Sequence, residues 1–204
     1  MKPLVTLRSK AVPLLRDNID TDAIIPSREM RSVSKDGLAD GLFAGWRYTT
    51  INGREIVPDF VLNRPESQGA RILLAGANFG CGSSREHAVW ALSEFGFRVV
   101  IALSFSPIFQ GNCIRNGIAP IVLPVEAVER IASGTAQGDW VTVDLQACEV
   151  RTDDHTFAFV MEDEARTMLI EGADAIELTL RRRAEIEGFF ARDAEERPWI
   201  YLSD

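Results

Sequence analysis

Residues 78–87 read Asn-Phe-Gly-Cys-Gly-Ser-Ser-Arg-Glu-His. The apolar run at 72–77 predicts a buried strand before them, and residues 88–92 predict the start of an apolar helix after them. A glycine-rich turn between a strand and a helix directs backbone N–H groups toward whatever lies beyond the helix start. The stretch therefore predicts a strand–turn–helix unit with an anion site in its turn.

The hydroxyl and guanidinium groups of this turn favour a chemical role. A serine at the positive end of a helix is well placed to carry transient negative charge, because free N–H groups stabilise an alkoxide. Arg85 offers a planar fork to a carboxylate. The plainer interpretation is that Ser83 only caps the helix, with Glu86 completing a capping box, and that Arg85 is a surface charge.

Composition bounds the class of protein. The chain has 204 residues, of which 46% are hydrophobic and 25% charged, as in one ordinary globular domain. The net charge of −8 argues against nucleic-acid binding, and the basic triplet at 181–183 lies among glutamates on a predicted solvated helix face. An acidic protein that handles acidic substrates needs local positive charge. The arginines that qualify are Arg28, Arg31, Arg85 and Arg115.

Cysteine and histidine usage argues against a metal site within the chain. Cys81, Cys113 and Cys148 are widely spaced and odd in number, which suggests a reducing cytosol rather than a disulfide framework. With only two histidines, no iron–sulfur or zinc ligand set is expected. We find no secretory signal and no apolar run of membrane-spanning length, so a cytoplasmic location is expected.

Hydrophobic periodicity outlines the remaining elements. Short strands are predicted near 4–7, 11–14, 99–102 and 121–123, with antiparallel strands between 140 and 160. Helices are predicted at 85–95, 106–116, 126–132 and 162–171, with a further helix near 37–43 in a long polar connection. We expect a single domain over residues 1–204, with a helical tail at about 184–204.

Two further segments carry polar side chains with open interpretations. Residues 18–22 (Asn-Ile-Asp-Thr-Asp) are either a catalytic acid segment or a turn with Asx caps. Residues 104–117 follow a strand end, where ligand sites gather in parallel α/β sheets, or they supply ordinary loop and cap contacts. His87 lies one helical turn from Ser83 and is either its base or a packing residue.

The motif Asn-Phe-Gly-Cys-Gly-Ser-Ser-Arg-Glu-His-Ala at 78–88 resembles the signature of the aconitase swivelling-domain family. Within that family it is most similar to the small subunits of bacterial 3-isopropylmalate dehydratases. The resemblance covers nearly the whole chain, and the eleven-residue motif is highly specific. Further matching segments lie at residues 20–26, 58–63, 90–92, 95–102 and 106–112.

The resemblance implies a fold, a partner and a reaction. The fold is α/β, an aconitase-type swivelling β/β/α domain with a mixed sheet flanked by helices. The partner is a large subunit that carries a [4Fe–4S] cluster, while this chain binds no cofactor or metal of its own. The reaction moves a hydroxyl between adjacent carbons of 2-isopropylmalate, through 2-isopropylmaleate, in leucine biosynthesis.

The resemblance also implies residue roles at matching positions. Ser83 matches the base that removes a proton beside a carboxylate, and Arg85 matches the substrate-carboxylate arginine. Ser84 matches a neighbouring substrate contact, and Asp22 an active-site aspartate. The loop after Pro26 departs from the family pattern by being more polar.

That polar loop leaves the substrate open. Arg28 or Arg31 is a candidate second carboxylate ligand, and the alternative substrate is another substituted malate, of the citramalate or dimethylmalate type. Two other classes also remain. A Ser–His hydrolase built on Ser83 and His87 is disfavoured by the absence of a G-x-S-x-G elbow. A non-catalytic anion-binding module predicts that Ser83 is dispensable.

Overall fold

A computed structural model of the chain describes residues 1–30, 35–51 and 53–201. Both of its four-stranded sheets belong to the unit Met1–Gly172, and the unit Ala173–Asp204 is helical. The second unit contains α7 (Ala175–Leu180) and α8 (Arg183–Glu196), so the tail is helical from an earlier residue than its sequence indicated. No helix among the described residues is long and apolar enough to cross a membrane.

The central sheet is parallel and has the order β2-β3-β4-β5. Its strands β3 (Ile72–Ala75) and β4 (Val99–Ala102) are fully buried, which is why their sequences are continuously apolar. The flanking strands are β2 (Ala11–Leu14) and β5 (Ala119–Val122). Helix α3 (His87–Phe95) connects β3 to β4, so the predicted β–α–β unit is confirmed.

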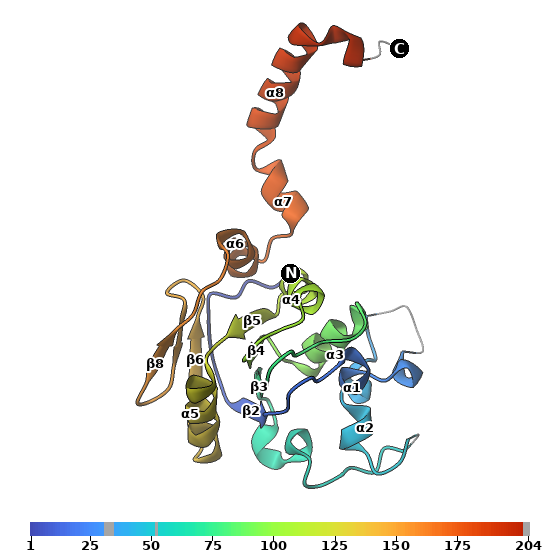
Figure 1. The fold of residues 1–204 in the computed structure, drawn as a ribbon, viewed down its shortest axis with the longest axis vertical. Coiled ribbons are helices and arrows are strands. Elements are labelled where there is room, and N and C mark those ends of the chain that lie inside the picture. The colour runs from blue at the N-terminus through green and yellow to red at the C-terminus, as the bar shows by residue number, and fades with distance from the viewer. Residues whose placement is uncertain (31–34, 52, 202–204) are drawn as a thin grey trace. The chain divides into compact units, whose positions relative to one another are not determined.

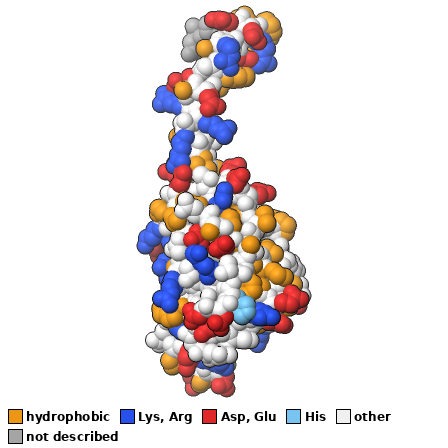
Figure 2. All heavy atoms as spheres, turned by 90° about the vertical axis from the view of Figure 1, so that its left-hand side faces the viewer, with side chains coloured by type: hydrophobic (Ala, Val, Ile, Leu, Met, Phe, Trp, Pro, Cys, Tyr) orange, Lys and Arg blue, Asp and Glu red, His pale blue; other side chains and the backbone are white. Residues whose placement is uncertain are grey.

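The second sheet is antiparallel and has the order β1-β6-β7-β8. In β6 (Val141–Asp144) the two valines are buried while Thr142 and Asp144 are half-buried, as expected for a sheet with one face in solvent. Figure 2 shows acidic and basic side chains interspersed on this side of the molecule. The other strands are β1 (Thr6–Ser9), β7 (Glu149–Arg151) and β8 (Thr156–Ala158).

The parallel sheet separates two apolar cores, because alternate side chains of its strands point to opposite faces. Ile72 and Leu74 belong to the core shared with the antiparallel sheet and α5 (Val125–Ala136). Leu73 and Ala75 belong to the core shared with α3 and α4 (Pro107–Arg115). Figure 1 shows the antiparallel layer and α3 on opposite sides of the parallel sheet. The β/β/α fold is confirmed, with parallel and antiparallel strands in separate sheets.

In its described residues, the long connection between β2 and β3 contains only short elements. The helix predicted near residues 37–43 is a 3-10 turn, η2 (Ala39–Gly41).

The helix predicted at 162–171 is confirmed as α6 (Asp163–Glu171), which ends at Gly172 with a φ of 70°. The remaining short elements are α1 (Thr21–Ile24), η1 (Ser27–Glu29), α2 (Ala44–Arg47), η3 (Val61–Asn63), η4 (Pro65–Ser67) and η5 (Pro198–Ile200).

The predicted start of α3 was wrong. The helix begins at His87 with Glu86 as N-cap, and Glu86 makes no side-chain capping bond. The expected capping box between Ser83 and Glu86 therefore does not form. Asn112 and Asn116 of the α4 segment bind the Ser84 carbonyl and the Glu86 carboxylate, so contacts distant in sequence hold residues 83–86 outside the helix.

Gly80 is the position where the turn tolerates no side chain. Its φ is 75°, in the left-handed region, and an added Cβ would lie 2.1 Å from Cγ of the Phe109 ring. The backbone of the turn passes directly over this buried aromatic ring, which no other residue type would permit. Phe109 thereby fixes the height of the turn above α4.

We expect Gly80→Ala to lower the free energy of unfolding by about 2–5 kcal/mol, because left-handed strain adds to overpacking against Phe109. The matched control is Gly69→Ala. Gly69 has a φ of 72° but nothing within 4 Å of its added Cβ, so only about 1–2 kcal/mol of backbone strain is expected. Urea denaturation of both variants measures the difference, and equal losses would contradict the close-packing argument.

Candidate active site

The loop after β3 is tied to the loop after β2 by backbone hydrogen bonds. The N–H of Gly80 donates to the Ile19 carbonyl over 2.8 Å, and the N–H of Thr21 donates to the Cys81 carbonyl over 3.0 Å. These bonds place Asp22, one residue after Thr21, beside the glycine turn. Residues 18–22 therefore adjoin the Ser83 loop, although about sixty residues separate the two segments.

On its other side the same loop is tied to the segment after β4. The N–H of Phe79 donates to the Ser104 carbonyl over 3.0 Å, and the Ser106 N–H donates to the Phe79 carbonyl over 3.0 Å. The Ser104 hydroxyl also accepts from the Asn78 N–H over 2.8 Å. Three loops thus meet at the carboxyl ends of β2, β3 and β4, the edge where parallel sheets commonly bind ligands.

Residues 83–85 form an exposed segment between the turn and α3. Ser83 and Ser84 are exposed, and Arg85 is half-buried. Within the described residues, neither serine hydroxyl makes a hydrogen bond, and the backbone N–H groups of residues 82–85 donate none. Hydroxyl and amide donors are therefore available together at one point, as an anion-binding or proton-transfer site requires.

Arg85 and Asp22 form an ion pair across the two loops. The guanidinium contacts both carboxylate oxygens, through Nη1 to Oδ1 and through Nη2 to Oδ2 at 3.4 Å. The Asp22 side chain is 58% exposed and that of Arg85 is 30% exposed. Asp22 lies in the first turn of α1, whose N-cap Asp20 accepts from the Ala23 N–H over 2.7 Å. Two predicted site residues are thus in direct contact.

His87 has a packing role. Its ring lies 4.7 Å from the Trp90 ring, centroid to centroid, one helical turn along α3. No hydrogen bond joins Ser83 to His87 among the described residues. The contact that a Ser–His nucleophile needs is therefore not formed by these two side chains.

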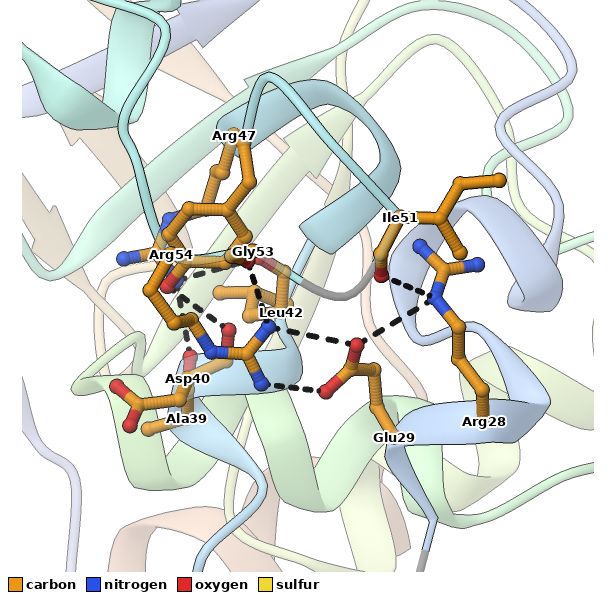
Figure 3. Close-up of polar contacts among 10 residues, drawn as sticks. Arg28, Glu29, Ala39, Asp40, Leu42, Arg47, Ile51, Gly53 and Arg54 are labelled. Atoms are coloured by element: carbon orange, nitrogen blue, oxygen red, sulfur yellow. Dashed lines mark hydrogen bonds and ion pairs between the residues drawn. The ribbon is translucent and has the colours of Figure 1, made fainter.

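Arg28 points into a polar cluster centred on Glu29 (Figure 3). Its Nε donates to the Ile51 carbonyl over 3.0 Å and lies 3.5 Å from Glu29 Oε1. Glu29 also binds Arg54, with 2.7 Å between Arg54 Nη2 and Glu29 Oε2, and its side chain is only 5% exposed. The hydrogen bond to Glu29 raises the pKa of the Arg54 guanidinium. The described contacts of Arg28 hold it to the polar connection, and Arg31 lies outside the described residues.

The structure adds site contacts from α4 that the sequence reasoning did not assign. The side-chain amide of Asn112 donates to the Ser84 carbonyl over 3.4 Å, and that of Asn116 donates to Glu86 Oε1 over 2.7 Å. The only signal in the sequence was the four-residue spacing of two asparagines after a strand end. That spacing alone does not show which loop they would contact.

Among the described residues, no group of three or more His, Cys, Asp or Glu side chains could hold a metal ion. The three cysteines are free, and burial raises the pKa of the Cys113 thiol above its ordinary value. The described part of this chain does not fit an iron–sulfur cluster.

The chain is similar to known proteins over nearly its full length. Residues 1–126 match the family model of the aconitase C-terminal domain. The 3-isopropylmalate dehydratase small subunit of Cupriavidus necator is 54% identical over 206 residues, covering 99% of each chain. The corresponding subunit of Acidothermus cellulolyticus is 48% identical, covering 97% of this chain and 98% of its own.

The chain is also similar to a solved structure of a 3-isopropylmalate dehydratase. The crystal structure of 3-isopropylmalate dehydratase from Methanocaldococcus jannaschii superposes with a TM-score of 0.65 and 30% sequence identity. The match covers 90% of this chain and 99% of the archaeal one. The chain therefore belongs to the family of 3-isopropylmalate dehydratase small subunits, within the aconitase C-terminal domain family.

Proposed function

We propose that this chain is the small subunit of a hydro-lyase that interconverts 2-isopropylmalate and 3-isopropylmalate through 2-isopropylmaleate, in leucine biosynthesis. The observation that carries the proposal is the loop 83–85 at the carboxyl ends of three parallel strands, with Asp22 against Arg85. Full-length similarity to the small subunits supports the substrate.

Ser83 is the proposed base. Dehydration requires removal of a weakly acidic proton from the carbon beside a carboxylate, so the base and the developing negative charge both need electrostatic support. The Ser83 hydroxyl is exposed, and the neighbouring N–H groups of residues 82–85 donate to no described residue. These groups stabilise a Ser83 alkoxide without a histidine.

Arg85 and Ser84 are the proposed carboxylate ligands. A guanidinium binds a carboxylate through two parallel N–H bonds, and Asp22 already engages Arg85 in this way. A substrate carboxylate would share the guanidinium with Asp22 or displace it, and either event changes the charge around Asp22. Asp22 is therefore proposed to couple substrate binding to the catalytic groups. Arg28 and Arg31 remain candidates for the second carboxylate.

The proposed partner is a large subunit that holds a [4Fe–4S] cluster. When bound there, the cluster would supply a Lewis acid for departure of the substrate hydroxyl. The small subunit would contribute the base, the carboxylate ligands and the exclusion of water. A cytoplasmic location accompanies this proposal, because the three free cysteines fit a reducing compartment.

A second candidate substrate is a smaller malate, such as citramalate or dimethylmalate. The observation in its favour is the polar cluster of Arg28, Glu29 and Arg54 in the connection after Pro26. A polar connection provides less apolar surface for an isopropyl group, which favours a smaller substituent.

Substrate profiling of the complex with its large subunit, assembled without oxygen, separates the two candidates. We expect 3-isopropylmalate to give the highest kcat/KM, measured by the ultraviolet absorbance of the unsaturated product. Fast turnover of citramalate together with no turnover of 3-isopropylmalate would overturn the leucine assignment and favour the second candidate.

We expect Ser83→Ala to lower kcat by about 10²–10⁴-fold, the usual contribution of a positioned base, while the complex still assembles. Ser133→Ala is the matched control, because Ser133 is an exposed serine of α5. Full activity of the Ser83 variant would instead support a non-catalytic anion-binding module. Size-exclusion chromatography of each complex checks assembly.

Asp22→Asn should separate catalysis from stability. Asp22 is exposed and Arg85 only half-buried, so loss of the pair should change the free energy of unfolding by no more than about 1 kcal/mol. The same small change is expected for Asp163→Asn, which removes an exposed carboxylate paired with Arg166 in the first turn of α6. Only the Asp22 variant should lower kcat/KM, and equal activity of the two variants would argue against a site role for Asp22.

A further inference from the structure

One face of α4 contacts the site loop at three points in register. Phe109, Asn112 and Asn116, its C-cap residue, are spaced by three and four residues, which places them on the same side of the helix. Phe109 lies under Gly80, Asn112 binds the Ser84 carbonyl, and Asn116 binds Glu86. The helix therefore follows the loop from its glycine turn to the first residue before α3.

Asn112 is held in place by its own partners. Its side chain is buried, its amide group donates to the Ser84 carbonyl over 3.4 Å, and its carbonyl oxygen accepts from the Arg115 guanidinium. A buried amide whose donor and acceptor groups are both used has a defined orientation. It therefore restrains the backbone directly before Arg85.

Asn116 makes the stronger contact with the loop. Its amide group donates to Glu86 Oε1 over 2.7 Å and to the backbone carbonyl of Asn112 over 2.9 Å. Its carbonyl oxygen accepts from the Trp90 indole N–H over 3.0 Å. Both amide functions are used, so the side chain cannot turn over without losing three bonds. Glu86 is thereby joined to α4 and, through Trp90, to the second turn of α3.

We propose that Asn116 is a positioning residue for the dehydratase reaction, because it fixes Glu86 and so aims the adjacent Arg85 at the substrate carboxylate. This inference rests on the proposed function. It assigns to Asn116 an effect on substrate binding, whereas a purely structural residue would affect only the stability of the fold.

The test exchanges donor and acceptor between the two side chains. Asn116→Asp places a carboxylate against Glu86 and removes the donor, so KM for 3-isopropylmalate should rise about 10–100-fold, the scale of one lost hydrogen bond to a charged group. The loss in kcat should be smaller. Glu86→Gln should raise KM only about 2–5-fold, because its amide oxygen still accepts from Asn116, although more weakly than a carboxylate.

The double variant Asn116→Asp/Glu86→Gln should recover most of the lost affinity. The new glutamine amide can donate to the new aspartate, so the bond returns with its direction reversed, and KM should fall at least about 5-fold below that of the single Asn116 variant. Asn63→Asp is the matched control. Asn63 likewise donates two bonds through its side-chain amide, but both go to backbone carbonyls, those of Arg47 and Val57, in the connection before β3.

The possible outcomes distinguish failure of the positioning role from loss of fold and from failure of the proposed function. An unchanged KM for Asn116→Asp, a rise no larger than in Asn63→Asp, or no recovery in the double variant would each overturn the positioning role. Circular dichroism and thermal unfolding of every complex show whether a change in KM follows from loss of fold. Absence of turnover by the wild-type complex would instead reject the proposed function, whatever the variants do.

Discussion

The close approach of the Gly80 backbone to the Phe109 ring is the constraint on which the site depends. It lets the loop after β3 lie low between the loops after β2 and β4 and bond to both. The loop thereby gains its order from neighbouring backbone rather than from a helix. The hydroxyls of Ser83 and Ser84 take no part in these bonds, so an ordered loop keeps exposed polar groups.

The start of α3 at His87 has the same consequence, because it leaves the Ser83 hydroxyl out of a helix cap. A capping box would have used the Ser83 hydroxyl and the Glu86 carboxylate to satisfy helix N–H groups and would have contributed about 1 kcal/mol. The protein instead begins the helix at His87 and binds Glu86 to Asn116. The stabilising capping box is thus absent at the segment where function is proposed, and the compensating contacts come from the α4 segment.

Sequence reasoning identified the elements whose signal is local. The fully buried runs of β3 and β4, the alternation in β6 and the glycine that ends α6 each have a pattern within a few residues. The helix start, the 3-10 turn at Ala39–Gly41 and the Glu29 cluster were not identified, because they depend on partners from other segments. Ser83, Ser84 and Arg85 were predicted as site residues from one specific motif, whereas the Asn116 contact crosses 30 residues and required the fold.

Under the proposed function, the ion pair between Arg85 and Asp22 would reconcile an acidic protein with an acidic substrate. The chain carries a net charge of −8, so the Arg85 guanidinium would supply the local positive charge that a dicarboxylate needs. Asp22 neutralises that guanidinium, but Asp22 is exposed and Arg85 only half-buried, and a pair this accessible to solvent is worth only about 1 kcal/mol or less. A substrate carboxylate with additional donors from residues 82–85 can exceed this small energy. Asp22 would therefore keep Arg85 oriented at little cost to binding of the proposed substrate, which a buried partner would not allow.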